Sequence, residues 1–440
     1  MRKEKFYWVK LICYSVGMLD IRFIRENKEI VQEGAKKKHI NFDVEVLIKT
    51  DDERLAALKR FEELRAEQNR TSLMIGGNLA LEERKQLISE MQLLKTDLKA
   101  REDELRDVTV RWQKMMLEVP NIPDISVPEG ESDEQNAEIR SWGELPQFSF
   151  APRDHVALLE MNDLADFERG VKVSGFRGYF MKNEGAELFF ALWNYFYSYF
   201  IQKGYTPMIV PSLVRRESFI GTGILPQSEE DLYKVGDNEY LAGTAEVAMM
   251  GYHMDEMIPK EELPKKYIAF SPCFRAEAGK HGADVKGIIR VHEFFKIEQV
   301  LLCEASHEES VKWHEEITAH VEHLMQTLKL PYHVVLNCGG DLGLGQVKKY
   351  DIEAWMPSQQ KYRETHSSSY FHDFQTRRLN IRYKDADGKT RYVHSLNNTA
   401  CATSRLPAAI LENYQQEDGS IVIPDVLRPY MGGKTIITRK

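Results

Sequence analysis

Residues 274–298, with the sequence FRAEAGKHGADVKGIIRVHEFFKIE, carry charged and aromatic side chains on both sides of a glycine-containing loop. The segments that flank the loop resemble strands, in which alternate side chains share one face. Two such sets are expected, namely Arg275 with Glu277, and Arg290, His292, Phe294, Lys296 and Glu298. Because burial of unpaired charge is strongly unfavourable, this face requires solvent or a charged ligand against it. The stretch predicts a binding site for a highly charged molecule, with a solvated surface strand as the alternative.

The elements that must position this stretch follow a mixed pattern. Strand-like runs at 332–338 (YHVVLNC) and 350–356 (YDIEAWM) are separated by amphipathic helices at 186–203 and 311–328. Helices and strands do not alternate regularly, which favours an antiparallel sheet over a parallel one. We expect an α+β fold for residues 141–440.

The region before this fold predicts a different architecture. Between Leu87 and Met115, apolar residues recur in steps of four and three, which is typical of a coiled-coil seam. A weaker stripe that contains Leu55 and Leu64 precedes it, and Gly76-Gly77-Asn78 offers a place for the chain to reverse. The pattern predicts an antiparallel helical hairpin.

Pro120 is expected to end the second helix of this hairpin. The stretch that follows is rich in Pro, Gly, Ser and acidic residues, a composition typical of linkers. We therefore expect a helical arm domain over residues 18–120, a linker over 121–140 and the α+β domain over 141–440.

Composition narrows the classes of function. The net charge of -9 argues against a protein that coats nucleic acid over its whole surface. The five cysteines lie far apart without zinc-ligand spacing, which indicates reduced thiols and a cytoplasmic location. No segment approaches the roughly 20 apolar residues of a membrane span. Residues 1–17 have a basic start and an apolar stretch, so a targeting signal stays open beside an upstream start before Met18.

Three segments resemble the signature motifs of one enzyme family. Residues 274–298 resemble motif 2 of the class II aminoacyl-tRNA synthetases, and in detail that of the seryl-tRNA synthetases. Residues 393–415 (VHSLNNTACATSRLPAAILENYQ) resemble motif 3, whose arginine falls on Arg405. The predicted helix that ends at Gly204, with the YTPMIVPSLV that follows it, resembles motif 1, whose proline falls on Pro211. The resemblance runs from about Met18 to the C-terminus and includes the helical arm.

The resemblance implies activation of L-serine by ATP. Arg275 would contact the α-phosphate and the serine carboxylate, and Arg405 the γ-phosphate, because a guanidinium fork pairs with such oxygens bidentately. Glu277 would face the adenine amino group, and adenine would stack on Phe294. The ATP-binding residues that the resemblance implies are Arg275, Ala276, Glu277, Arg290, Phe294, Glu364, Thr365, His366, Ser367 and Arg405.

Glu364 and Ser367, in KYRETHSSS, match the magnesium ligands of the family, and such hard oxygen ligands suit Mg²⁺. Their spacing of three favours a strand end that turns into a loop, because the two side chains would oppose each other on a continuous strand. For L-serine, the implied binding residues are Thr244, Ala245, Glu246, Glu298 and Thr399. Thr399 stands where the bacterial form of the family has serine, and it retains the hydroxyl.

The resemblance also implies partners. The helical arm would hold the long variable arm of a serine tRNA, tRNA(Ser), through backbone contacts that recognise shape, and tRNA(Sec) is a further candidate substrate. Candidate contacts on the arm are Arg65, Arg70, Arg84, Lys85 and Lys95. Motif 1 forms the two-fold interface of class II enzymes, and residues 186–200 are unusually aromatic for a surface helix, so we expect a homodimer.

Two alternatives stay open. A paralogue could load an activated amino acid onto a carrier protein, although the long arm argues against this. A catalytically inactive paralogue could bind only nucleic acid or a partner. The presence of the expected charged residues argues against that second alternative; these are Arg275, Glu277, Glu298, Glu364 and Arg405.

Overall fold

The computed structural model describes residues 19–77, 80–278 and 286–439, and these form two compact units. We call residues 19–36 and 40–120 the arm unit, and residues 37–39 and 121–439 the sheet unit. The predicted N-terminal extension, residues 1–17, lies outside the described residues. Among the described helices, none is long and apolar enough to cross a membrane.

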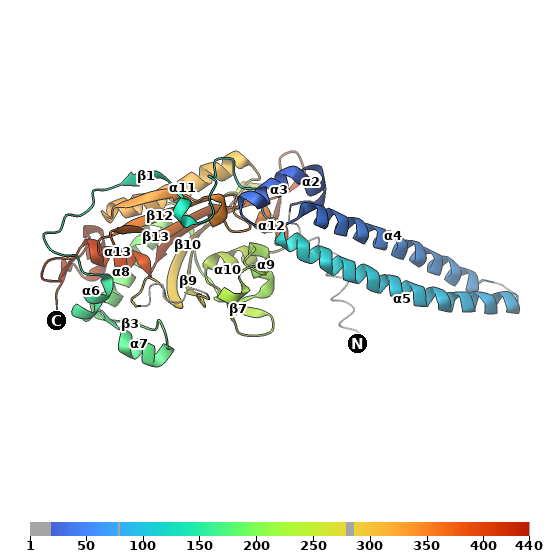
Figure 1. Ribbon diagram of the computed structural model, residues 1–440, viewed down its shortest axis with the longest axis horizontal. Helices are drawn as coiled ribbons and strands as arrows, with labels where there is room; N and C mark the ends of the chain where they lie inside the picture. The colour runs from blue at the N-terminus through green and yellow to red at the C-terminus, as the bar shows by residue number, and fades with distance from the viewer. Residues whose placement is uncertain (1–18, 78–79, 279–285, 440) are drawn as a thin grey trace. The chain divides into compact units, whose positions relative to one another are not determined.

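The arm unit is dominated by two long antiparallel helices (Figure 1). Two short helices, α2 (Ile21–Glu26) and α3 (Lys28–Lys37), precede α4 (Val44–Ile75) and α5 (Leu81–Glu118). Helix α4 is capped at its N-terminus by Asp43, whose carboxylate accepts hydrogen bonds from the main-chain N–H groups of the first turn. The predicted helical hairpin is confirmed.

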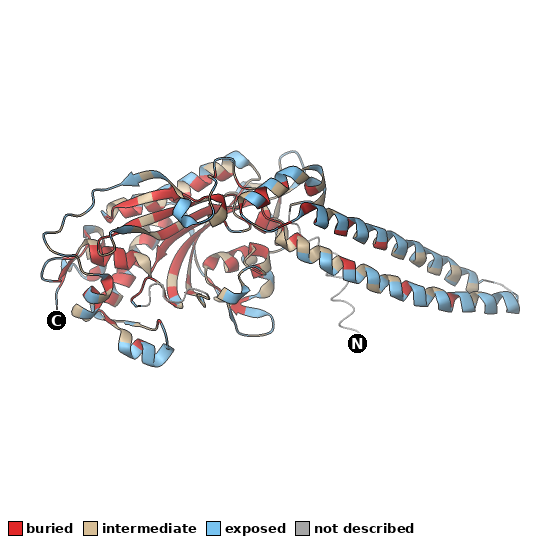
Figure 2. Cartoon of the chain, in the orientation of Figure 1, coloured by how far each residue is buried: buried red, intermediate tan, exposed pale blue. Residues whose placement is uncertain are grey.

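Buried residues follow a narrow seam along the hairpin, while most of its surface is exposed (Figure 2). On α5 the buried positions are Met91, Leu98, Val108 and Met116. The prediction for the other helix is wrong at Leu55, which is 46% exposed. Arg54 takes the inner position instead, with its guanidinium carbon 4.4 Å from the centre of the Trp112 ring. The α4 stripe is difficult to recognise in the sequence because a charged residue occupies one of its inner positions.

The sheet unit contains an eight-stranded sheet in which all neighbouring strands are antiparallel except β4 and β9 (Figure 1). In spatial order the strands are β1 (Ala137–Trp142), β11 (Tyr332–Leu336), β12 (Lys348–Met356), β13 (Lys361–Tyr370), β16 (His394–Ala402), β10 (Glu293–Cys303), β9 (Lys265–Phe274) and β4 (Thr206–Ile209). This arrangement confirms the predicted α+β fold.

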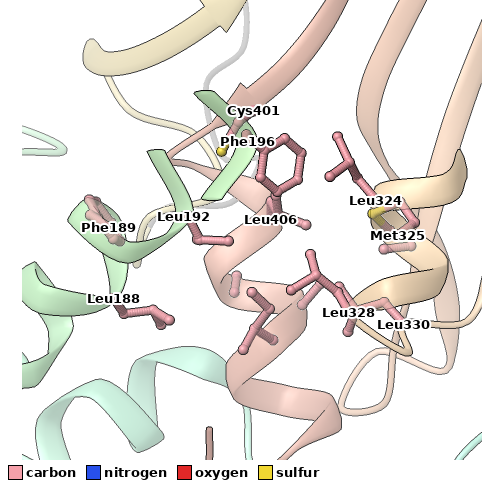
Figure 3. Packing of buried hydrophobic residues seen from close by; sticks show 14 of the residues in the cluster. Leu188, Phe189, Leu192, Phe196, Leu324, Met325, Leu328, Leu330, Cys401 and Leu406 are labelled. Atoms are coloured by element: carbon pink, nitrogen blue, oxygen red, sulfur yellow. The ribbon is translucent and has the colours of Figure 1, made fainter. Parts of the chain in front are cut away.

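Three helices cover one face of this sheet, and they are α8 (Asn183–Gln202), α11 (His307–Thr327) and α13 (Arg405–Asn413). Figure 3 shows Leu192 and Phe196 of α8 meeting Leu324 of α11 and Leu406 of α13 in the apolar core. Strand side chains such as Ile352 complete the core from the sheet. The opposite face of the central strands is therefore the one that remains for polar side chains.

The smaller elements surround the sheet. The other helices of this unit are α6 (His155–Met161), α7 (Phe167–Ser174), α9 (Arg216–Thr222), α10 (Ala245–Tyr252) and α12 (Phe374–Arg378). Short strands pair as β2 (Ala165–Asp166) with β3 (Phe180–Met181), and β17 (Ile421–Val422) with β18 (Ile436–Ile437). Two three-stranded sheets contain β5 (Leu213–Arg215), β7 (Glu239–Leu241) and β6 (Tyr233–Lys234), and β15 (Thr390–Tyr392), β14 (Arg382–Lys384) and β8 (Met257–Ile258).

The stretch 121–140, predicted as a linker, is packed within the sheet unit. Asn121 is buried and donates hydrogen bonds from its amide to the main-chain oxygens of Gly345 and Phe371, at 3.0 and 2.8 Å. Its last residues belong to the edge strand β1, which pairs with β11. These residues therefore belong to the sheet unit, with Asn121 bonded to distant main-chain atoms, although the side chains of residues 131–135 are exposed to solvent as expected for a linker.

Candidate active site

Glu364 and Ser367 lie on one continuous strand, β13, and a β-bulge places both side chains on the same face. Ser367 pairs with Asp351 of β12, and Glu364 pairs with Glu353. Asp351 and Glu353 are two residues apart and share a face, so their partners share it too. Thr365 is the extra residue of the bulge. The predicted turn into a loop is wrong, because the bulge reconciles a continuous strand with the spacing of three.

A second bulge occurs in the neighbouring strand β16. Glu298 of β10 pairs with Thr399, whereas the preceding Ile297 pairs with Cys401, so Ala400 is the extra residue. Thr399 therefore faces the same side of the sheet as Glu298. The two bulges together direct the polar side chains of three strands onto the face that the core helices leave uncovered.

A polar pocket lies on this face. Its lining residues are Arg275, Glu277, Ile289, Arg290, Val291, Phe294, Lys296, Glu364, Thr365, Thr399, Ala402, Ser404 and Arg405. Most of the predicted ATP-binding residues and the predicted serine ligand Thr399 are thus brought together. The residues come from segments more than a hundred positions apart in the chain, so the pocket is a property of the folded sheet.

Arg405 and Glu364 form an ion pair at one wall of the pocket. Arg405 is the first residue of α13, and its Nη1 donates to Glu364 Oε2 at 2.9 Å. Burial opposes ionisation of Glu364, but the charges of Arg405 and Lys349 outweigh it and lower the pKa of Glu364 to about 2. The carboxylate is therefore ionised throughout the physiological pH range, as a magnesium ligand must be.

Glu364 and Ser367 stay the predicted magnesium ligands. Among the residues that the structure describes, no group of three or more His, Cys, Asp or Glu side chains is arranged to hold a metal ion. A hard cation at this place would need substrate oxygens and water besides the two protein groups. The ionised carboxylate and the hydroxyl on one face fit that requirement.

Arg275 also lines this pocket, and its guanidinium carbon is 5.2 Å from the centre of the Phe294 ring. Glu277 accepts a hydrogen bond from Arg290 Nη1 at 2.6 Å. Arg290 and His292 precede β10, which begins at Glu293, so the prediction that they alternate along the strand is wrong. The intervening residues 279–285 lie outside the described part of the chain.

The main chain after Arg275 is held by a single aspartate. The N–H of Ala276 donates to the main-chain oxygen of Asp231 at 2.9 Å, and the N–H of Ala278 donates to its carboxylate at 3.0 Å. Asp231 ends a short 3-10 helix that precedes β6. This contact fixes the start of the loop, and nothing in the sequence pattern points to it.

Thr244 and Glu298, two of the predicted serine-binding residues, belong to a second polar cluster beside the pocket. Thr244 caps the N-terminus of α10 and accepts a hydrogen bond from Lys296 Nζ at 3.0 Å. Lys296 also forms an ion pair with Glu298, which is only 2% exposed. Thr244 Oγ1 donates to Glu298 Oε2 at 3.4 Å. Because each charge in this cluster has a partner, the ion pair and the hydrogen bonds offset the desolvation cost of its burial.

Glu246, two residues into the same helix, completes this cluster. Burial raises the pKa of Glu246 to about 7, although hydrogen bonds from Gln375 and Asn397 oppose the rise. Neither Gln375 nor Asn397 was among the predicted site residues. Lys296 was expected on this face of the sheet but was given no role.

Two predicted residues direct their side chains elsewhere. His366 pairs with Ile352 and faces the helix-covered core, where burial lowers its pKa to about 3. The methyl group of Ala245 is buried in an apolar cluster with Met249 and Ile258. Only the main chain of these two residues remains for contact with a ligand. Neighbouring residues of a strand or helix point in different directions, so a motif of consecutive residues includes side chains that face away from the site.

Comparison with known proteins identifies both units. Residues 18–123 match the family model of the seryl-tRNA synthetase N-terminal domain, and residues 232–414 match that of the tRNA synthetase class II core domain (G, H, P, S and T). The chain is 44% identical over 421 residues to the serine–tRNA ligase of Deinococcus radiodurans, covering 96% of this chain and 99% of that protein. The serine–tRNA ligase of Thermodesulfovibrio yellowstonii is also 44% identical, with 94% and 99% covered.

Solved structures agree with these matches. A seryl-tRNA synthetase from Pyrococcus horikoshii in complex with ATP aligns with a TM-score of 0.85 and 40% identity, over 96% of this chain and all of that one. A cytoplasmic serine–tRNA ligase from Naegleria fowleri in complex with AMP gives a TM-score of 0.83 and 30% identity, over 96% and 99%. Sequence, fold and the arrangement of the three motifs agree throughout the chain. The chain therefore belongs to the seryl-tRNA synthetase family of class II aminoacyl-tRNA synthetases.

Proposed function

We propose that the chain is a serine–tRNA ligase that activates L-serine with ATP and transfers it to tRNA(Ser). The observation that carries the proposal is the pair of β-bulges, which aligns Glu364, Ser367 and Thr399 on one sheet face. Arg275 and Arg405 line the same pocket. This combination supplies positive charge, a hydroxyl and a cation-binding carboxylate within one site, as condensation of an amino acid with ATP requires.

In the first step, a carboxylate oxygen of serine attacks the α-phosphorus of ATP, and the bond to the departing pyrophosphate breaks. Arg275 would neutralise charge on the α-phosphate and Arg405 charge on the leaving group, since a guanidinium fork pairs with phosphate oxygens bidentately. In the second step, a terminal hydroxyl of the tRNA attacks the activated carbonyl and AMP departs. Neither step requires a nucleophilic side chain, and positioning supplies much of the rate.

Serine selection would rest on the cluster around Thr244. Glu246 and Glu298 suit the ammonium group, and Thr399 offers a hydroxyl near the substrate side chain. Alanine would leave buried polar groups without partners, a penalty that such sites use to reject it strongly. Threonine would need room for one more methyl group.

Magnesium would be held by Glu364 and Ser367, together with phosphate oxygens. When bound, the ion would neutralise charge on the phosphates. The low pKa of Glu364 supports this assignment, because no proton has to be displaced near neutral pH.

The arm unit would bind the tRNA. Its five candidate contacts are exposed on α4 and α5, and they are Arg65, Arg70, Arg84, Lys85 and Lys95. Exposed cations on a rigid hairpin suit contacts to a phosphate backbone, which recognise shape rather than base sequence. A long variable arm on tRNA(Sec) would be bound in the same way, so tRNA(Sec) is part of the proposal. The described cysteines are free buried thiols, as in a reducing compartment, and we place the reaction in the cytoplasm.

A homodimer through α8 and β4 is also part of the proposal. Phe196 and Phe200 of α8 are fully buried in the core, but Phe190 is 60% exposed and Ile209 of β4 is 87% exposed. Beside α8 lies a cavity of about 490 Å³ whose lining is largely apolar and aromatic and includes Phe176 and Trp193. An exposed apolar surface of this kind supports an interface with a second copy.

The decisive test of the activity is serine-dependent ATP–pyrophosphate exchange in the absence of tRNA. The full chain should exchange label with serine, and exchange with alanine should be weaker by several orders of magnitude. No serine-dependent exchange, or equal exchange with alanine, would contradict the proposal.

A further inference from the structure

Gln375 is a buried glutamine of α12 whose two amide atoms have different partners. Its Nε2 donates to Glu246 Oε1 at 2.5 Å, and its Oε1 accepts from Ser395 Oγ at 2.8 Å. Both Gln375 and Ser395 are 1% exposed. Because the Ser395 hydroxyl donates to the amide oxygen of Gln375, the amide N–H group is the end that faces Glu246. The glutamine therefore has one defined orientation.

Glu246 lies where two charged neighbours compete. Glu298 and Lys296 of β10 are the charged groups that face it, the first repelling and the second attracting its negative charge. Asn397 of β16 is a further hydrogen-bond donor to it. Through Thr244, which contacts both Lys296 and Glu298, the carboxylate belongs to the cluster that would surround the serine amine. Gln375 approaches this cluster from a helix on which no site residue was predicted.

We propose that Gln375 is a positioning residue for serine binding: its amide N–H holds Glu246 as an ionised acceptor that is aimed at the substrate ammonium group. This inference rests on the proposed function, in which Glu246 binds the amine. Gln375 itself would touch no substrate atom. A neutral donor is suited to this role, because it orients the carboxylate without cancelling the charge that attracts the ammonium group.

The protonation of Glu246 gives the role a measurable consequence. Burial raises the pKa of Glu246 to about 7, and the hydrogen bond from Gln375 counteracts part of that rise. Removal of the donor should therefore raise the pKa further. Near neutral pH a larger fraction of Glu246 would then be protonated, and a protonated carboxyl presents a donor rather than an acceptor to the ammonium group.

The test is Gln375→Met, which keeps the length of the side chain and removes its hydrogen bonds, including a longer one of 3.5 Å from Nε2 to the main-chain oxygen of Thr222. In serine-dependent ATP–pyrophosphate exchange at pH 7, we expect the KM for serine to rise about ten- to hundredfold. The KM for ATP should change less than about twofold, since Gln375 makes no contact with the proposed ATP-binding residues. The acid limb of kcat/KM for serine should also move to higher pH, as loss of a donor to a carboxylate requires.

Gln415→Met is the matched control. Gln415 is equally buried, but its amide bonds to the main chain of Arg153 and Glu412. Its replacement should lower thermal stability to a similar extent and leave the KM for serine and the pH profile unchanged. Ser395→Ala provides a milder second variant, which keeps the glutamine but frees its orientation, and its KM for serine should rise about two- to tenfold.

The outcomes separate this inference from the proposed function. If Gln375→Met retained wild-type exchange activity, a normal KM for serine and an unshifted acid limb, the role of Gln375 would be overturned. The proposed function would then still stand. Equal increases of the KM values for serine and ATP would show a purely structural role and would overturn the role of Gln375 too. Absence of serine-dependent exchange in the wild-type chain would overturn both.

Discussion

Arg405 Nη1 donates to two oxygens of the same residue, the side-chain Oε2 and the main-chain oxygen of Glu364, each at 2.9 Å. The contact joins the start of α13 to the bulged strand β13. It holds the arginine proposed for the γ-phosphate against the carboxylate proposed for magnesium. Binding of a phosphate to Arg405 or of a cation to Glu364 must therefore alter the ion pair between these two residues. The two residues should for this reason act as one unit in catalysis.

We predict that Arg405→Lys lowers exchange activity by about 100-fold or more, although the charge is retained. Lysine lacks the planar fork with which an arginine binds two oxygens at once. Glu364→Gln should lower it comparably, and the double variant should be no worse than about tenfold below either one, because residues of one unit are not additive. Exchange kinetics measure all three. Arg428→Lys, at an ion pair with Asp425 outside the pocket, is the control and should remain near wild type.

Serine activation should have an acid limb set by Glu246. The ionised form binds the ammonium group, and the pKa of Glu246 is raised to about 7 by burial. The value of kcat/KM for serine should consequently be maximal above pH 7 and fall about tenfold per unit below it. Glu246→Gln should lower the plateau and abolish this limb, and persistence of the limb in that variant would assign it to another group.

Thr399 should be replaceable by serine but not by valine. Thr399→Ser retains the hydroxyl opposite Glu298 and should keep the KM for serine within about threefold. Thr399→Val keeps the shape, removes the hydroxyl and should raise that KM about ten- to hundredfold. If the valine variant bound serine as well as the wild type does, Thr399 would have no part in selection.

Deletion of Leu55–Met115 should separate the two steps of the reaction. The remaining ends lie close together, since Arg54 contacts Trp112 across the hairpin, and a short flexible linker can join them. Exchange should survive within a few-fold, because every predicted active-site residue lies beyond residue 240. Charging of tRNA(Ser) should fall by roughly two orders of magnitude or more, as backbone contacts supply much of the affinity. Normal charging by the truncated chain would make the arm purely structural.

Ile209→Glu should convert a dimer into a monomer. Ile209 is 87% exposed in a single chain, so a carboxylate at this position should not affect the stability of the monomer. In the proposed interface the carboxylate would be buried without a partner. Sedimentation at micromolar concentration should report a dimer for the wild type and a monomer for the variant. Ile125→Glu, at an isoleucine that is 97% exposed elsewhere, should stay dimeric. A monomeric wild type would refute the assembly.

The pocket residues were largely predictable because they stand within local motifs that resemble those of a known family. The resemblance names Arg275, Arg405 and Glu364, whose residue types suit oxyanion substrates and a hard cation. The helical hairpin was predictable for a related reason, since the recurrence of apolar residues in steps of three and four is visible within one short segment of the sequence. The α+β fold followed from the order of such local elements.

The remaining features depend on pairing between distant segments. The bulge at Thr365 is a property of the register between β12 and β13, which no single strand specifies. Gln375 is 129 residues from Glu246 in the chain, and a buried glutamine has no periodic signature. Asn121 likewise bonds to carbonyls 224 and 250 residues away, which is why its polar segment was interpreted as a linker.

The two β-bulges show that the alignment of these side chains depends on strand register as well as on spacing along the chain. If β13 kept all its residues but paired regularly with β12, Thr365 would pair with Glu353, and Glu364 would turn over to the face beneath α13. Deletion of Thr365 would instead leave Glu364 and Ser367 two positions apart in a regular strand, and therefore still on one face. Deletion of Ala400 would likewise leave Thr399 opposite Glu298, so shortening either strand by its extra residue should disturb the alignment less than straightening the bulge at full length.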